Sequence, residues 1–480
     1  MADRHQNFVS GKWGDAVGKG TFEKLNPANK SESLGTFPRS DHRDVDRAVD
    51  GVRSQGRQWS ALPALARGEI LSRTVALCRA RRDAVAEAVT RESGKLLPDA
   101  IDEVQAGLEA LAVLAGERGG RVEGGAAAAG SGCHALAFPV PCGVAAVLTS
   151  WSLPFAVMLT AAGGALIAGN SVVLKPSEHT PLVGQRILEF LLEAGVPAGV
   201  VALVQGGGEE VGAPLMRHPD VAVVALTGAA DVVREAAIAC AAEQKRPALE
   251  ILRREVTLVL EDAELETAVR GILQGSFAPL AGRAAPVGAV VVQGKVGKEL
   301  LARLVEAAGR ASPGDGLEPA STIPPLVTER HLKRLQAWVR TGVREGAKLL
   351  SGGEIYREAD CRRGWFYAPT VLAEVQSTMR VSQDEVWGPA LAVLSASTVE
   401  DAVARVNALP GSSAVGIYSR NLGHALRLAE ELHAEHVRIN ESSRHLPRVP
   451  LGVEGPGLWS PALRTFARWR TITLDVGTSP

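Results

Sequence analysis

Apolar side chains recur at helical spacing between residues 41 and 117. Val45 and Val52 fall on one face of a first segment, and the apolar positions of 70–77 and 85–89 continue the pattern. This periodicity predicts a helical N-terminal region.

An extended apolar run, residues 135–149, follows a stretch rich in glycine and alanine at 119–132. Pro139 and Pro141 lie within it, and proline in a strand is typical of a sheet edge or a hairpin. We therefore expect a pair of strands near the surface. The C-terminal run at 462–476 also has β-forming residues, and we expect it to pair with the 135–149 run or with a second subunit.

From residue 151 onward, apolar runs of helix length alternate with runs of strand length. The expected helices are 155–168, 181–194, 209–216 and 230–243, and the strands that follow them are 171–175, 199–205, 221–228 and 247–251. A second alternating region has expected strands near 256–260, 288–293 and 391–395, with helices near 296–309, 328–345, 399–406 and 422–432. Such alternation predicts an α/β fold with two doubly wound parallel sheets.

Polar residues and glycines follow the expected strands. Lys175 and Glu178 come after one strand, glycines 206–208 after the next, and residues 227–230 after a third. Because ligands of doubly wound sheets bind at the carboxyl ends of the strands, we expect these positions to share one cleft.

Composition excludes several other classes of protein. The 480 residues are 46% hydrophobic and 22% charged, with a net charge of -1, so neither disorder nor a polyanion-binding surface is indicated. The five cysteines form no CxxC pair and the ten histidines show no metal-ligand spacing, so we expect no metal site. No signal peptide is evident, and the most apolar stretch, 155–169, is shorter than the roughly 20 residues that span a bilayer. We expect a cytoplasmic protein without nucleic-acid or membrane partners.

Five segments resemble, in order and spacing, sequences of the aldehyde dehydrogenase superfamily. They are FPVPCGVAAVLTSWSLPF, GNSVVLKPSEHTP, GGGEEVGAPLMRHPDVAVVALTG, QDEVWGPALAV, and AVGIYSRN followed by HVRIN. The resemblance implies two Rossmann-type doubly wound domains and a small β extension for oligomerisation. It implies a dinucleotide-binding domain at 1–118 and 142–252, a catalytic-type domain at 253–461, and the oligomerisation extension at 119–141 and 462–480.

Members of this family oxidise aldehydes with NAD(P), using a cysteine nucleophile, an asparagine that holds the oxyanion and a glutamate base. The resemblance places Ser152 at the asparagine position, Glu250 at the glutamate position and Ala284 at the cysteine position. A serine hydroxyl does not replace the amide donor, and an alanine methyl forms no hemithioacetal. Arg253 and Arg254 also stand where the family has Gly-Lys. We therefore expect Glu250 to be a relict general base.

The residues that the resemblance assigns to NAD or NADP are better kept. They are Trp151 as an aromatic wall, Lys175 and Glu178 at the adenine ribose, Thr227, Gly228 and Ala229 at the pyrophosphate, and Glu385 and Trp387 at the nicotinamide ribose. Ala229 replaces a serine of the family, so one hydroxyl donor is lost where phosphate would lie.

Structural interpretations stand beside these assignments. Lys175 and Glu178 could be a relict surface ion pair, and Glu250 could pair with Arg253 or Arg254. Cys240 is expected to be a buried core residue rather than a displaced nucleophile.

Three functions remain open from the sequence. The first is a pseudoenzyme, a structural or regulatory subunit that forms a homo-oligomer or joins an active homologous subunit. The second is an active NAD(P)-dependent oxidoreductase that uses another nucleophile, for which Ser276 is the nearest candidate. The third is a dinucleotide-binding sensor.

Overall fold

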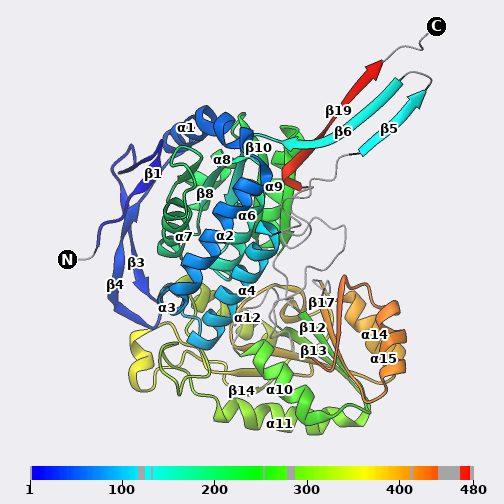
Figure 1. Cartoon of the computed structure of the whole chain (residues 1–480). Helices are drawn as coiled ribbons and strands as arrows, with labels where there is room; N and C mark the ends of the chain where they lie inside the picture. Colours follow the sequence, from blue (N-terminus) through cyan, green and yellow to red (C-terminus); the bar gives the residue numbers. More distant parts are fainter. Residues whose placement is uncertain are drawn as a thin grey trace.

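The first of two large sheets contains the predicted β/α alternation of residues 144–251. The computed structural model describes residues 3–116, 125–130, 133–251, 255–277, 287–410, 414–441 and 465–475 (Figure 1). This sheet has the strand order β11-β10-β7-β8-β9-β1-β2, in which β11 to β9 are parallel and β1 and β2 are antiparallel additions. Its strands are β11 (Arg246–Ile251), β10 (Val221–Gly228), β7 (Val144–Leu148), β8 (Ser171–Lys175), β9 (Val201–Leu203), β1 (Asn7–Val9) and β2 (Lys12–Gly14).

Helices cover both faces of this sheet. One face packs on α6 (Pro154–Ile167) and α7 (Pro181–Glu193), which are backed by α2 (Ala64–Ala80), α3 (Arg82–Ser93) and α4 (Leu97–Ala115). The other face packs on α1 (His42–Ala61), α8 (Ala213–Arg217) and α9 (Ala230–Ala242). We call this sheet and its helices the first unit.

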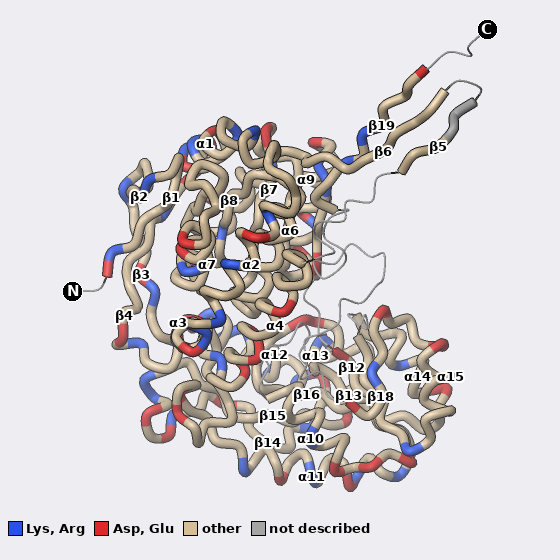
Figure 2. Tube along the Cα trace, viewed as in Figure 1, with Lys and Arg blue, Asp and Glu red and all other residues tan. Residues whose placement is uncertain are grey.

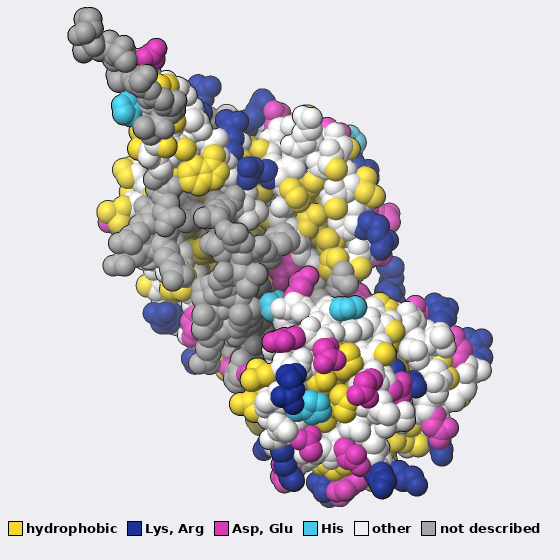
Figure 3. All heavy atoms as spheres, turned by 90° about the vertical axis from the view of Figure 1, so that its right-hand side faces the viewer, with side chains coloured by type: hydrophobic (Ala, Val, Ile, Leu, Met, Phe, Trp, Pro, Cys, Tyr) yellow, Lys and Arg dark blue, Asp and Glu magenta, His cyan; other side chains and the backbone are white. Residues whose placement is uncertain are grey.

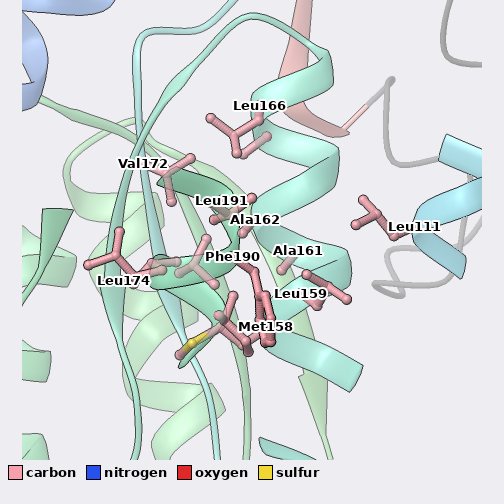
Figure 4. Packing of buried hydrophobic residues seen from close by; sticks show 14 of the residues in the cluster. Leu111, Met158, Leu159, Ala161, Ala162, Leu166, Val172, Leu174, Phe190 and Leu191 are labelled. Atoms are coloured by element: carbon pink, nitrogen blue, oxygen red, sulfur yellow. The ribbon is translucent and has the colours of Figure 1, made fainter. Parts of the chain in front are cut away.

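Helix α6 is apolar on all sides because it lies between two layers. Every residue from Pro154 to Ile167 is buried. Figure 4 shows its side chains between Val172 and Leu174 of β8 and Leu111 of α4. The approach to α4 is close, since a Cβ on Gly107 would lie 2.8 Å from Cα of Ala156. This packing fixes the chain that leads from β7 into α6.

The second unit is built around a sheet of order β14-β15-β16-β13-β12-β17-β18, parallel except for β14. Its strands are β12 (Glu255–Val259), β13 (Val287–Gln293), β14 (Lys348–Ser351), β15 (Thr370–Ala373), β16 (Ala390–Ala396), β17 (Ala414–Tyr418) and β18 (His436–Ile439). One face packs on α12 (Glu329–Arg344), α14 (Val399–Ala408) and α15 (Leu422–Glu431), and the other on α10 (Leu265–Ser276) and α11 (Gly297–Arg310).

A three-stranded arm projects from the first unit (Figure 1). Its strands are β19 (Ala467–Asp475), β6 (Cys133–Pro141) and β5 (Gly125–Gly130), with β6 in the centre. Asn170 joins the arm to the body: its Oδ1 accepts from the amides of Cys142 and Gly143 at 2.8 and 2.9 Å, and its Nδ2 donates to the carbonyl of Phe466 at 2.8 Å.

The prediction of a surface strand pair at 135–149 is wrong for its second half. β6 ends at Pro141, whereas Val144 and Val147 belong to β7, where they are buried between β10 and β8. The second half is part of the central sheet, and only the first half lies in the arm, where β6 pairs with β19 and β5. The C-terminal run pairs with β6 of the same chain, from Ala467 opposite Pro141 to Asp475 opposite Cys133.

The predicted α/β class and both alternating regions are confirmed, as is the helical N-terminal region. The helix expected at 209–216 begins with a π-helical turn, Gly208–Gly212, and continues as α8. Residues 3–40 contain strands that the sequence did not predict: β1 and β2, and a separate two-stranded sheet of β3 (Thr21–Asn26) and β4 (Asn29–Pro38).

The surface mixes charges of both signs. Lysine and arginine positions and aspartate and glutamate positions are interspersed along the chain trace of both units (Figure 2). Within the described ranges, no helix combines the length and the apolar character needed to cross a membrane.

Candidate functional site

A cavity of about 810 Å³ lies between the two units. The first unit contributes the loop after β7 and the start of α9, and the second unit contributes α12 and the segment after α13 (Arg380–Gln383). Of the predicted site residues, the cavity lining includes Trp151, Ser152, Ala229, Glu385 and Trp387. The structure thus brings together residues that are more than 200 positions apart in the sequence.

Two threonine hydroxyls lie at the adjacent carboxyl ends of β7 and β10. Leu148 pairs with Leu226, so Thr149 and Thr227 are the next residues on neighbouring strands. They are 8% and 2% exposed, and neither hydroxyl has a hydrogen-bond partner among the described residues. Buried polar atoms nearly always have a hydrogen-bond partner. These two hydroxyls lie where the strand order reverses between β7 and β10, which is where ligands of doubly wound sheets bind. They therefore favour a site in which a ligand supplies the missing partner. Thr227 was predicted and Thr149 was not.

The turn after Thr227 leads into α9 without a side-chain cap. Gly228 ends β10, and Ala229 offers no side-chain acceptor at the start of α9, although Asp231 Oδ1 within the first turn accepts from the Val232 amide at 2.9 Å. The free N–H groups at the start of a helix bind anions. The assignment of residues 227–229 to a phosphate stays a prediction.

Lys175 and Glu178 follow β8. Lys175 Nζ lies 3.6 Å from Glu178 Oε2, and the lysine side chain is 6% exposed. Burial lowers the pKa of Lys175, and the Glu178 charge opposes this shift. Burial acts to raise the pKa of Glu178, but the charges of Lys175 and His179 together with hydrogen bonds make the net shift downward. Lys175 is therefore a buried residue, not a member of a surface pair, although neither residue belongs to the cavity lining.

His331 connects the segment that follows β8 with the wall of the cavity through ring contacts. Its imidazole lies 5.8 Å from that of His179 and 5.2 Å from the Trp151 indole, and Trp151 lies 5.9 Å from Trp387. Thr328 caps α12, and its Oγ1 is 2.7 Å from His331 Nδ1. Burial lowers the pKa of both histidines to about 4, so both rings are neutral at pH 7.

The segment carrying Glu385 and Trp387 is held against α12. Arg334 donates to the Glu385 carbonyl at 3.2 Å. Gly388 has a φ of +157°, and a Cβ there would lie 2.4 Å from Cδ2 of Leu335. A glycine is therefore needed where this segment passes over α12.

The predicted catalytic positions are only partly described. Ser152 is buried and its Oγ lies 2.9 Å from Ser150 Oγ. Glu250 is half-buried on β11, the edge strand of the first sheet, and pairs in register with Thr227. Ala284, Arg253 and Arg254 lie outside the described residues, so the interpretation of Glu250 as their ion-pair partner stays a prediction.

All five cysteines of the chain lie within the described residues, and none lines the cavity. Burial raises the pKa of four of these thiols, to about 12 for Cys78. Cys240 is buried on α9, as expected for a core residue. Ser276, the alternative nucleophile, is also buried, and its hydroxyl donates to the Ile272 carbonyl at 2.7 Å within α10.

Comparisons with known proteins agree with the fold and with the five segments. The sequence model of the aldehyde dehydrogenase family matches residues 13–454. An alpha-ketoglutaric semialdehyde dehydrogenase of Bacillus subtilis is 30% identical over 439 residues, which are 91% of this chain and 90% of the relative.

Solved structures give the same result. An NAD-dependent aldehyde dehydrogenase of Sinorhizobium meliloti is similar with a TM-score of 0.92 and 29% identity, over 100% of this chain and 96% of that one. A betaine aldehyde dehydrogenase of Staphylococcus aureus in complex with NAD⁺ is similar with a TM-score of 0.94 and 25% identity, over 99% of this chain and 95% of that one. The chain belongs to the aldehyde dehydrogenase family.

Proposed function

We propose that this chain binds NAD or NADP but has lost aldehyde dehydrogenase chemistry, and that it serves as a structural or regulatory subunit. The observation that carries the loss is the placement of the cysteines. Since all five have known positions and none of them lines the cavity, no cysteine is in place to attack an aldehyde there.

Two further features support the loss of activity. The family resemblance assigns Ala284 to the position of the nucleophile and Ser152 to the position of the oxyanion asparagine. The Ser152 hydroxyl is next to that of Ser150, so it already has a hydrogen-bonding neighbour. The alternative, an active enzyme with another nucleophile, is not favoured by Ser276, whose hydroxyl is bonded inside a helix.

Dinucleotide binding is supported by the chemistry of the cleft. The hydroxyls of Thr149 and Thr227 are buried and lack partners among the described residues, and α9 begins without a side-chain cap beside them. These groups fit a pyrophosphate, and the Lys175 ammonium fits ribose hydroxyls. The relatives from S. meliloti and S. aureus are described as NAD-dependent and as an NAD⁺ complex. When bound, the dinucleotide would be able to accept hydride, but our proposal gives it a binding role here.

Exposed apolar side chains on the arm support an oligomer. Trp469, Ile472 and Leu474 on β19 are 52%, 41% and 42% exposed, and Leu136 on β6 is also exposed. Figure 3 shows hydrophobic side chains gathered along the base of the arm. Exposed strands with apolar side chains usually pair with another chain, so we propose a homo-oligomer, or a mixed assembly with an active relative. The absence of disulfides among the five cysteines is consistent with a cytoplasmic location.

The test combines two titrations of the full-length protein. Calorimetry with NAD and NADP measures binding, and a panel of aldehydes with either dinucleotide is followed by absorbance of the reduced form. We expect binding without reduction. Turnover that is lost in Glu250→Gln would refute the loss of activity, and no heat at millimolar dinucleotide would refute binding.

A further inference from the structure

A buried ion pair contacts the loop after β7, which carries Trp151 and Ser152. Lys95 and Glu103 are completely buried, and Lys95 Nζ forms a salt bridge to Glu103 Oε2. Removing a charge from water is costly, and an apolar pair would often serve stability as well. The pair therefore requires a reason beyond filling the core.

Each partner also contacts the chain that leads from β7 into α6. Lys95 Nζ donates to the carbonyl of Ser152 at 2.8 Å. Glu103 Oε1 accepts from the amides of Phe155 and Ala156 at 2.9 and 3.2 Å, at the start of α6. The two side chains thus hold the segment on both sides of Leu153, with the amides of α6 on one side and the Ser152 carbonyl on the other.

Lys95 is itself held by the second unit. Gly94 has a φ of +83°, and a Cβ there would lie 2.7 Å from Cγ of Pro325. Leu97 donates from its amide to the Gly316 carbonyl at 2.9 Å. A Cβ on Gly316 would lie 2.2 Å from the Lys95 carbonyl oxygen. Because the loop that carries Lys95 is packed so closely, the ammonium has little freedom to follow a displaced Ser152.

Trp151 precedes the Ser152 carbonyl and contacts His331 and Trp387 of the second unit. We propose that Lys95 is a positioning residue of the cleft: through the Ser152 carbonyl it holds the Trp151 indole in the orientation that a bound dinucleotide meets. This inference rests on the proposed dinucleotide binding, but the orientation of Trp151 can be measured without any ligand.

The main test is the double variant Lys95→Met/Glu103→Gln in the full-length chain. It removes both charges together, while the new amide oxygen at position 103 can still accept from the α6 amides. Leu71→Ala is the matched control, since Leu71 is fully buried in the same core and its loss destabilises the fold without reaching the loop. Far-UV circular dichroism confirms folding.

The NMR resonance of the His331 imidazole is the measurement that separates the two roles. It would not change if Lys95 contributed to stability alone. It is assigned by its disappearance in His331→Gln, and it senses the Trp151 ring current at 5.2 Å. We expect this resonance to shift in the double variant and not in Leu71→Ala, and the dissociation constant for the dinucleotide to rise about tenfold. An unchanged resonance in the folded double variant would overturn the proposal.

A second variant covers a failure to fold. Lys95→Met alone leaves the Glu103 carboxylate on its two amide donors, and the same shift of the His331 resonance is expected. No shift there would likewise overturn the positioning role. If the wild type binds no dinucleotide, the proposed function fails, while the His331 resonance still tests the role of Lys95.

Discussion

The imidazole of His331 meets the indole of Trp151 edge to face at 5.2 Å, and it does so as a neutral ring because burial lowers its pKa to about 4. His331 belongs to the second unit and Trp151 to the first, so the contact joins the two units at the wall of the cavity. Protonation would place a charge in a buried aromatic contact.

The first prediction concerns acid stability. The pKa of His331 is 6.5 in the unfolded chain and about 4 in the folded chain. The contribution of the neutral ring to folding stability is therefore complete above pH 6.5 and is lost as the pH falls to 4. We expect the stability difference between wild type and His331→Gln to shrink over this window, by on the order of 3 kcal/mol. Urea unfolding at a series of pH values measures it.

A comparison between variants is needed because another group acts in the opposite direction. Burial raises the pKa of Glu92 to about 7, so its contribution is complete below pH 4.5 and is lost as the pH rises to 7. The effect of Glu92 is present in both wild type and His331→Gln, so it cancels when their free energies of unfolding are subtracted. His433→Gln, which replaces an exposed histidine, is the control for the loss of an imidazole. A constant difference for His331→Gln would contradict the prediction.

Lys175→Met should weaken dinucleotide binding. The buried ammonium would donate charge-assisted hydrogen bonds to the ribose hydroxyls, and such bonds are worth about 1.5–3 kcal/mol, so the dissociation constant should rise about tenfold or more. Calorimetry at fixed ionic strength measures the change. Arg186→Met, which removes an exposed cation of α7, should leave binding unchanged. Equal affinity of the wild type and Lys175→Met would mean that Lys175 is a structural relict.

Glu178→Gln should shift preference towards NADP. The carboxylate is ionised, since its pKa is held below the ordinary value, and it would repel a 2′-phosphate near Lys175. Repulsion between two unit charges about 4 Å apart in bulk water is worth about 1 kcal/mol, or roughly fivefold in the ratio of the two dissociation constants. Glu189→Gln on the exposed side of α7 is the control. An unchanged ratio would show that the 2′-phosphate lies elsewhere.

Ala284→Cys should not restore aldehyde oxidation. A thiol alone lacks the amide donor for which Ser152 is a poor substitute, and oxyanion donors are worth about two to three orders of magnitude in rate. Absorbance of the reduced dinucleotide is followed with and without Glu250→Gln in the same background. Activity that depends on Glu250 would show that the remaining site is competent.

The arm should mediate assembly. We expect light scattering to give at least a dimer for the full chain at micromolar concentration, and a smaller species for Ile472→Glu/Leu474→Glu, because these exposed apolar side chains would become charged. Leu65→Glu changes a residue that is equally apolar and more exposed on α2, and it should assemble normally. A monomeric wild type would refute the prediction.

The sequence allows prediction of features that depend on a short stretch of neighbouring residues. Lys175 was predictable because a buried strand ends in a charged side chain, and Thr227 because a strand passes into a helix. The partners of Lys95 and His331 were not, since Ser152 and Trp151 are distant along the chain and no local pattern marks the contact. Strands β1 and β2 have three residues each, too few for an alternation to be recognised. Predictions on Ala284 and the domain boundaries stay predictions.

The joint between the arm and the central sheet has a consequence for assembly. Only Cys142 and Gly143 separate β6 from β7, and Asn170 binds the amides of both. β7 cannot slide, because it pairs with strands on both sides, so the arm's direction is set before any partner arrives. A second subunit would therefore meet a preorganised surface, and little conformational entropy would be lost on docking. In the proposed oligomer, the angle at which the arm leaves the sheet would set the orientation of the two subunits.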